Sequence, residues 1–101
     1  MDKLLINQVE DLYAQGENAA ENEDLELMDQ CTEKAQSLDA ENDERAAKAK
    51  KKLEYIVGEN EDLRESFMDN AKDTFAEWGF TGDPQYSCEF WEIAVDTAEC
   101  L

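Results

Sequence analysis

The chain has 101 residues, of which 27 are Asp or Glu and only nine are Lys or Arg, so its formal net charge at pH 7 is -18. Small soluble domains usually have a net charge of magnitude about 2–8. So negative a chain repels nucleic-acid phosphates and anionic lipid headgroups, which excludes direct binding to DNA, RNA or a membrane surface. Because 42% of the residues are hydrophobic, we expect a folded chain, a single acidic helical domain over residues 1–101.

The first half of the chain shows helical spacing of its apolar residues. Leu5, Val9, Leu12 and Tyr13 indicate a first helix. We expect Asn22 to cap a second helix, and a polar turn over 39–43 to separate it from a third. The apolar positions of the second helix are Leu25, Met28, Thr32, Ala35 and Leu38.

Glycines and asparagine mark the ends of the next two helices. The third helix should stop at Gly58, as a C-terminal glycine would stop it. Asn60 should cap a fourth helix that ends at Gly79. The inward residues of the third helix are Ala46, Ala49, Leu53, Ile56 and Val57. Those of the fourth are Leu63, Phe67, Ala71, Phe75 and Trp78.

The last element follows a loop over residues 80–83. Asp83 and Pro84 have the pattern of an N-cap and a first-turn proline for a final helix. Its inward residues would be Phe90, Trp91, Ala94, Ala98 and Leu101. Residues 86–90 also alternate as a strand would, so an α+β fold with a short strand near residues 85–91 stays open. We expect an all-α fold, a compact bundle of four or five helices.

Acidic residues recur at every fourth position of the expected fourth helix: Glu61, Glu65, Asp69, Asp73 and Glu77. At a rise of about 1.5 Å per residue, these carboxylates recur roughly every 6 Å. Like charges at this spacing destabilise a helix by a few tenths of a kcal/mol per pair, so stability alone would favour lysines among them. The row resembles the phosphates along a nucleic-acid strand, and we interpret it as a partner-binding surface.

A second acidic row lies on the expected final helix, at spacings of three and four residues. Its members are Glu89, Glu92, Asp96 and Glu99. No basic residue occurs after Lys72. We assign this row to the same partner-binding surface. The alternative for both rows is a solvated acidic surface, as in a salt-adapted protein.

Five of the nine basic residues cluster in one segment: Arg45, Lys48, Lys50, Lys51 and Lys52. Glu44 and Lys48 form a favourable i, i+4 pair, and the other cations are in a position to screen neighbouring acidic helices. We favour this internal role. The alternative is contact with an acidic part of a partner.

The sequence offers little for catalysis or metal binding. It contains no histidine, so neither a Cys–His nor a Ser–His pair exists. Residues 39–44 begin like a calcium loop, but Glu44 stands where glycine is needed and Lys50 at the bidentate position. Cys31 lies between Asp29 and Glu33, which should raise its thiol pKa and make it unreactive. We expect no enzyme activity, no bound metal and no cofactor.

The cysteines and the start of the chain bear on location. Cys31, Cys88 and Cys100 form an odd set without CxxC spacing, which indicates a reducing compartment. The apolar run over residues 4–6 is too short for the core of a signal peptide. We therefore expect a cytoplasmic protein.

In composition, size and carboxylate rows the chain resembles the DNA-mimic inhibitors of phages and mobile elements, which include anti-restriction and anti-CRISPR proteins. The resemblance implies a stoichiometric inhibitor that occupies the basic DNA- or RNA-binding surface of a host defence or DNA-processing complex. The expected partner is thus a basic nucleic-acid-binding protein. The alternative is an acidic helical adaptor that joins two proteins through its aromatic face.

Overall fold

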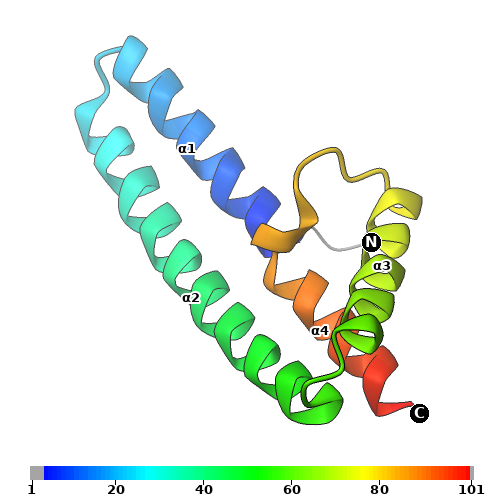
Figure 1. Ribbon diagram of the computed structural model, residues 1–101. Helices are drawn as coiled ribbons and strands as arrows, with labels where there is room; N and C mark the ends of the chain where they lie inside the picture. The colour runs from blue at the N-terminus through cyan, green and yellow to red at the C-terminus, as the bar shows by residue number, and fades with distance from the viewer. Residues whose placement is uncertain (1–3, 101) are drawn as a thin grey trace. The chain divides into compact units, whose positions relative to one another are not determined.

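The computed structural model describes residues 4–100, which form four α-helices and one short 3-10 helix (Figure 1). In chain order these are α1 (Leu5–Glu21), α2 (Leu25–Val57), α3 (Glu61–Glu77), the 3-10 helix η1 (Pro84–Tyr86) and α4 (Cys88–Glu99). The described range contains no strand, which confirms the all-α expectation. The alternative strand near residues 85–91 is wrong, because η1 and the start of α4 occupy that segment. Contacts divide the chain into two compact units, Met1–Asn42 and Asp43–Leu101.

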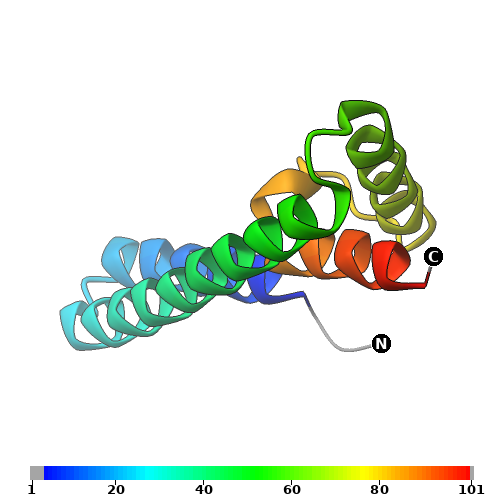
Figure 2. The same ribbon diagram turned by 60° about the horizontal axis from the view of Figure 1, so that its bottom comes forward.

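In the first unit, α1 and the part of α2 before Asp43 lie side by side and run in opposite directions (Figures 1 and 2). Gly16 of α1 lies against Cys31 and Thr32 of α2, with room for a Cβ only at van der Waals distance, 3.6 Å from the Cys31 Cβ. The buried positions are small or medium-sized: Leu5, Val9, Gly16, Ala19, Cys31, Ala35 and Asn42. Small side chains let the two helices approach closely.

The turn between α1 and α2 differs from the expected one. Asn22 is the C-cap of α1, and its side-chain amide donates to the Asn18 carbonyl at 3.0 Å. Glu23 then takes a left-handed backbone conformation with φ of 58°, and the Asp24 amide donates back to the Ala19 carbonyl at 2.8 Å. The Asp24 carboxylate accepts from the Leu27 amide at 3.2 Å. Asp24, and not Asn22, therefore caps α2.

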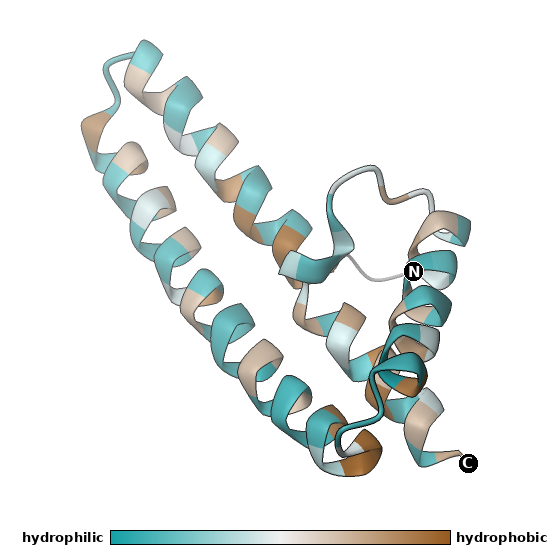
Figure 3. Cartoon of the chain, viewed as in Figure 1, coloured by the Kyte–Doolittle hydropathy of each residue, from teal (hydrophilic) through white to brown (hydrophobic). Residues whose placement is uncertain are grey.

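The expected polar turn over residues 39–43 is wrong, because α2 continues through this segment. The segment contains neither Gly nor Pro, and its Asp and Asn residues cost a helix only a few tenths of a kcal/mol each. The residues that begin like a calcium loop are therefore helical. Hydrophilic residues cover most of α2, and its most hydrophobic parts lie at its beginning and in its last turn (Figure 3). None of the helices formed by residues 4–100 is long and apolar enough to cross a membrane.

The helix ends of the second unit follow the sequence closely. Gly58 (φ 61°) and Gly79 (φ 79°) terminate α2 and α3 in the left-handed conformation that glycine adopts without strain. The side-chain oxygen of Asn60 accepts a hydrogen bond from the Leu63 amide at 3.1 Å and so caps α3. These predictions are confirmed. Asp83 and Pro84 cap and begin η1 instead of α4, and the Asp83 carboxylate accepts from the Gln85 amide.

Phe75 lies at the centre of the aromatic core of the second unit and is 1% exposed. Its ring stacks on Trp78, with centroids 5.2 Å apart, and meets the edges of Phe80 and Phe90. Phe90 in turn meets Trp91 at 5.0 Å. These contacts, and a hydrogen bond from Asn70 to Thr97, join α3 to α4.

Most expected core residues are buried, with three corrections. Tyr13, Leu25 and Trp78 are among the apolar positions that marked the expected helices, but all three are exposed. Leu25 is the first residue of α2 and is 62% exposed, and Trp78 follows the last residue of α3. Residues at a helix end lie beyond the reach of the neighbouring helix, which periodicity alone does not reveal. The inward position expected for Leu101 lies outside the described residues.

Candidate protein-binding surface

The acidic row of the expected fourth helix lies on α3, and all five carboxylates are exposed: Glu61, Glu65, Asp69, Asp73 and Glu77. Residues four apart form a ridge inclined about 26° to the helix axis, so the row slants across the helix. Phe67, Ala71 and Phe75 lie two positions away, on the opposite side, and are buried against the core. Core packing therefore fixes the direction in which the row faces.

Within the described part of the chain, the carboxylates of the α3 row have no ion-pair partner. Among residues 4–100, none of the five is paired with a basic side chain at ion-pair distance. None of them caps the helix either, since Asn60 does so. The carboxylates of the row are consequently available to solvent or to a partner.

Two basic residues flank the first part of the α3 row, a feature that the sequence reasoning missed. Arg64 and Lys72 line one shallow hollow together with Met68 and the first three carboxylates of the row. Arg64 is three residues after Glu61, and Lys72 is three residues after Asp69. Residues at this spacing are neighbours on a helix surface, so the sequence contained the signal that both cations lie beside the row. Asp73 and Glu77 lie outside the hollow, so the most uniformly negative part of the row is its C-terminal end.

The second acidic row lies on α4 and is held largely by its own chain. The Arg45 guanidinium lies 2.6 Å from the Glu92 carboxylate, and the Lys52 ammonium lies 2.5 Å from that of Glu99. The hydrogen bond to Glu99 raises the pKa of Lys52 above its ordinary value. Asp96 is exposed and lines a groove of about 320 Å³ between these pairs, over Ala49 and Val95.

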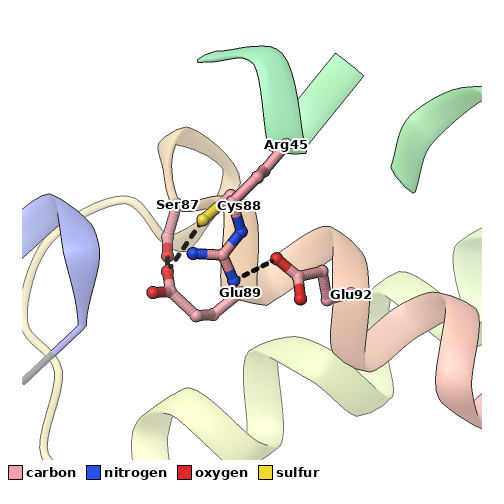
Figure 4. Close-up of polar contacts among 5 residues, drawn as sticks. All are labelled: Arg45, Ser87, Cys88, Glu89 and Glu92. Atoms are coloured by element: carbon pink, nitrogen blue, oxygen red, sulfur yellow. Dashed lines mark hydrogen bonds and ion pairs between the residues drawn. The ribbon is translucent and has the colours of Figure 1, made fainter. Parts of the chain in front are cut away.

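The remaining member of the α4 row is Glu89, which belongs to a polar network at the start of α4 (Figure 4). The Ser87 hydroxyl donates to the Glu89 carboxylate at 2.5 Å, and the Cys88 thiol lies 3.3 Å from the same oxygen. Burial, and then the charge of Glu89, raises the pKa of Cys88 to about 12. The thiol therefore stays protonated near neutral pH and is a poor nucleophile.

The basic segment of α2 is used mainly within the chain. Besides the pairs with α4, Lys48 pairs with Glu44 at 3.3 Å, as the i, i+4 spacing predicts. Lys50 lies over the ring of Trp91, 4.8 Å from its centroid. These contacts support the internal role that the sequence favoured. Arg45 and Lys52 pair with Glu92 and Glu99, two of the four carboxylates of the α4 row, which leaves α3 as the less compensated of the two rows.

The described residues contain no group of three or more His, Cys, Asp or Glu side chains placed to hold a metal ion. Exposed carboxylates on a single helix point outward and do not converge on one point. The arrangement is therefore suited to contact with an extended, positively charged surface.

No protein-family model, no curated protein and no solved structure matches this chain.

Proposed function

We propose that this protein is a stoichiometric inhibitor that mimics nucleic acid and occupies the basic DNA- or RNA-binding surface of a host defence or DNA-processing complex, as anti-CRISPR and anti-restriction proteins do. The observation that carries the proposal is the α3 row, five exposed carboxylates without an internal ion pair in the described part of the chain. Its spacing of roughly 6 Å suits a partner surface that binds successive phosphates.

The contrast between the two rows supports this proposal. On α4, Glu92 and Glu99 are paired with cations of α2, which is what stability favours. On α3, four successive like-charge steps destabilise the helix, each by a few tenths of a kcal/mol. Its last turn also contains no basic residue to complement the negative end of the helix dipole. Arg64 and Lys72 offset this repulsion only along the first part of the row. A basic partner would offset the remaining repulsion on binding.

Binding by such a row has clear physical consequences. The net charge of -18 steers the protein toward a positive groove and raises the association rate. Because α3 is already ordered, docking costs little conformational entropy. The carboxylates then pair with the Arg and Lys side chains that otherwise hold phosphates. The affinity should fall steeply as salt is added, because both surfaces are then screened.

The adaptor alternative rests on aromatic residues, several of which are core residues. Phe90 and Trp91 are buried and Phe80 is half-buried, whereas Trp78 and Tyr86 are exposed. An adaptor would bind through these exposed side chains, with weak dependence on salt. It is treated below as the opposing outcome of the test.

The experiment is capture of a partner on the immobilised full chain from a nucleic-acid-rich host lysate, followed by elution in a salt gradient. The isolated partner is then loaded with labelled DNA or RNA in the presence of increasing amounts of the protein. We expect competitive displacement of the nucleic acid, with no binding of nucleic acid to the protein itself. A partner that loads its nucleic acid normally while the protein stays bound would overturn the proposal and favour the adaptor.

A further inference from the structure

The groove between α2 and α4, in the second unit of the chain, has an apolar floor and two charged walls. The floor consists of Ala49 and Val95, which both line the groove and are buried. The volume is about 320 Å³, near the lower end of the range for small-molecule sites, about 300–1,000 Å³. The groove thus has room for a small ligand with an apolar part.

The two walls of the groove carry charges of opposite sign. The α2 wall contributes the cations Arg45, Lys48 and Lys52, and the α4 wall contributes the carboxylates of Glu92 and Asp96. Arg45 pairs with Glu92, and Lys52 pairs with another carboxylate of α4, so ion pairs join the helices on both sides of the groove. Asp96 is exposed and forms no ion pair with Lys48 or with any other cation of residues 4–100. A cation and a carboxylate that do not pair with each other therefore line the same groove.

Charge complementarity selects the class of ligand. The net charge of -18 repels a small anion from the protein, and the three cations of the α2 wall repel a small cation from the groove. A ligand that carries both signs and no net charge meets neither obstacle. Lys48 is able to turn toward such a ligand, because its pair with Glu44, at 3.3 Å, is exposed and contributes little to stability.

We propose that this groove binds a small zwitterion with an apolar side chain, an α-amino acid. The carboxylate of the ligand pairs with Lys48, its ammonium group pairs with Asp96, and its side chain covers Ala49 and Val95. Each charge of the ligand thus meets an opposite charge, and its apolar part lies on the apolar floor. The site lies on α2 and α4, so it is separate from the α3 row and goes beyond the proposed function.

The test titrates three ligands with the same apolar side chain into the full ¹³C-labelled chain. L-Leucine carries both charges, 4-methylpentanoate lacks the ammonium group, and 3-methylbutylamine lacks the carboxylate. We expect leucine to shift the methyl signals of Ala49 and Val95 with a dissociation constant of about 1–10 mM, as the few atoms of so small a ligand allow. Leucine should bind about tenfold more tightly than either analogue, because each analogue lacks one charge-assisted contact. Absence of these shifts with leucine, or an analogue that binds as tightly as leucine, would overturn the inference.

Substitutions in the two walls assign the two contacts. In Asp96→Asn, leucine and 4-methylpentanoate should bind equally, because the ammonium group no longer meets a carboxylate. In Lys48→Gln, leucine and 3-methylbutylamine should bind equally. The matched controls are Asp29→Asn and Lys34→Gln, which change the net charge by the same amounts at exposed positions of α2 in the first unit. Both controls should keep the preference for leucine over the two analogues. A preference that survives unchanged in Asp96→Asn or Lys48→Gln, or that is lost in a control, would overturn the inference.

Discussion

The Arg45 guanidinium lies 2.6 Å from the Glu92 carboxylate and ties the C-terminal part of α2 to α4. Both side chains are about 40% exposed, so the pair contributes at most about 1 kcal/mol to stability. Its larger consequence is electrostatic. It uses a carboxylate of the α4 row and a cation of the basic segment within the chain, and so leaves the α3 row as the more available anionic surface.

The buried thiol of Cys88 makes stability depend on pH at the alkaline end. Its pKa of about 12 in the folded chain exceeds the ordinary value of 9.0, so the folded state holds a proton that the unfolded state loses between these values. Stability is therefore lost as pH rises from about 9 to 12, by up to about 1.4 kcal/mol per pH unit. Urea unfolding of the wild type and Cys88→Ala across this range measures the effect. Identical pH slopes for the two proteins would contradict it.

The aromatic core predicts a large penalty for Phe75→Ala. This ring is buried and contacts Trp78, Phe80 and Phe90, so its removal should lower the free energy of unfolding by about 3–5 kcal/mol. Glu65→Gln, on the opposite side of α3, should be neutral or slightly stabilising because it removes like-charge repulsion. Chemical denaturation followed by circular dichroism measures both. A neutral Phe75→Ala would mean that the inward face of α3 is assigned incorrectly.

The left-handed conformation of Glu23 predicts a stabilising substitution. A residue with a Cβ is strained at a φ of 58°, whereas glycine adopts this conformation freely. Glu23→Gly should raise the free energy of unfolding by about 1 kcal/mol. Glu23→Gln removes the same charge but retains the strain, so it should give a smaller gain. If Gln stabilised as much as Gly, charge and not backbone strain would be the cause.

Excess negative charge predicts that salt stabilises the protein. At a net charge of -18, exposed carboxylates repel one another over distances that about 0.1 M salt screens, since the Debye length is then about 10 Å. The melting temperature should rise between about 0.01 and 0.1 M NaCl. Differential scanning calorimetry measures it. A falling melting temperature would show that attractive pairs, such as that of Lys52 with Glu99, outweigh the repulsion.

Local signals in the sequence predicted both ends of α3. Asn60 and Gly79 bound α3 as expected, because a cap needs only its own neighbours. The turn expected over residues 39–43 failed, since a polar segment without Gly or Pro is also compatible with a helix. The exposure of the α3 row could be predicted, because the apolar residues of this helix lie on its opposite side. The pairing of Glu92 with Arg45 did not, because it joins residues far apart in sequence.

The most direct test of the central claim is charge reversal on α3, as Glu65→Lys, Asp69→Lys and Asp73→Lys in one protein. The matched control reverses three exposed carboxylates of α1, Glu10, Glu17 and Glu21, so both variants change the net charge from -18 by six units to -12. Circular dichroism checks that both keep their helical content. We then measure how strongly each variant inhibits the loading of nucleic acid onto the captured partner. The account predicts that reversal on α3 abolishes inhibition and that the α1 control retains most of it. Equal inhibition by the two variants would contradict it.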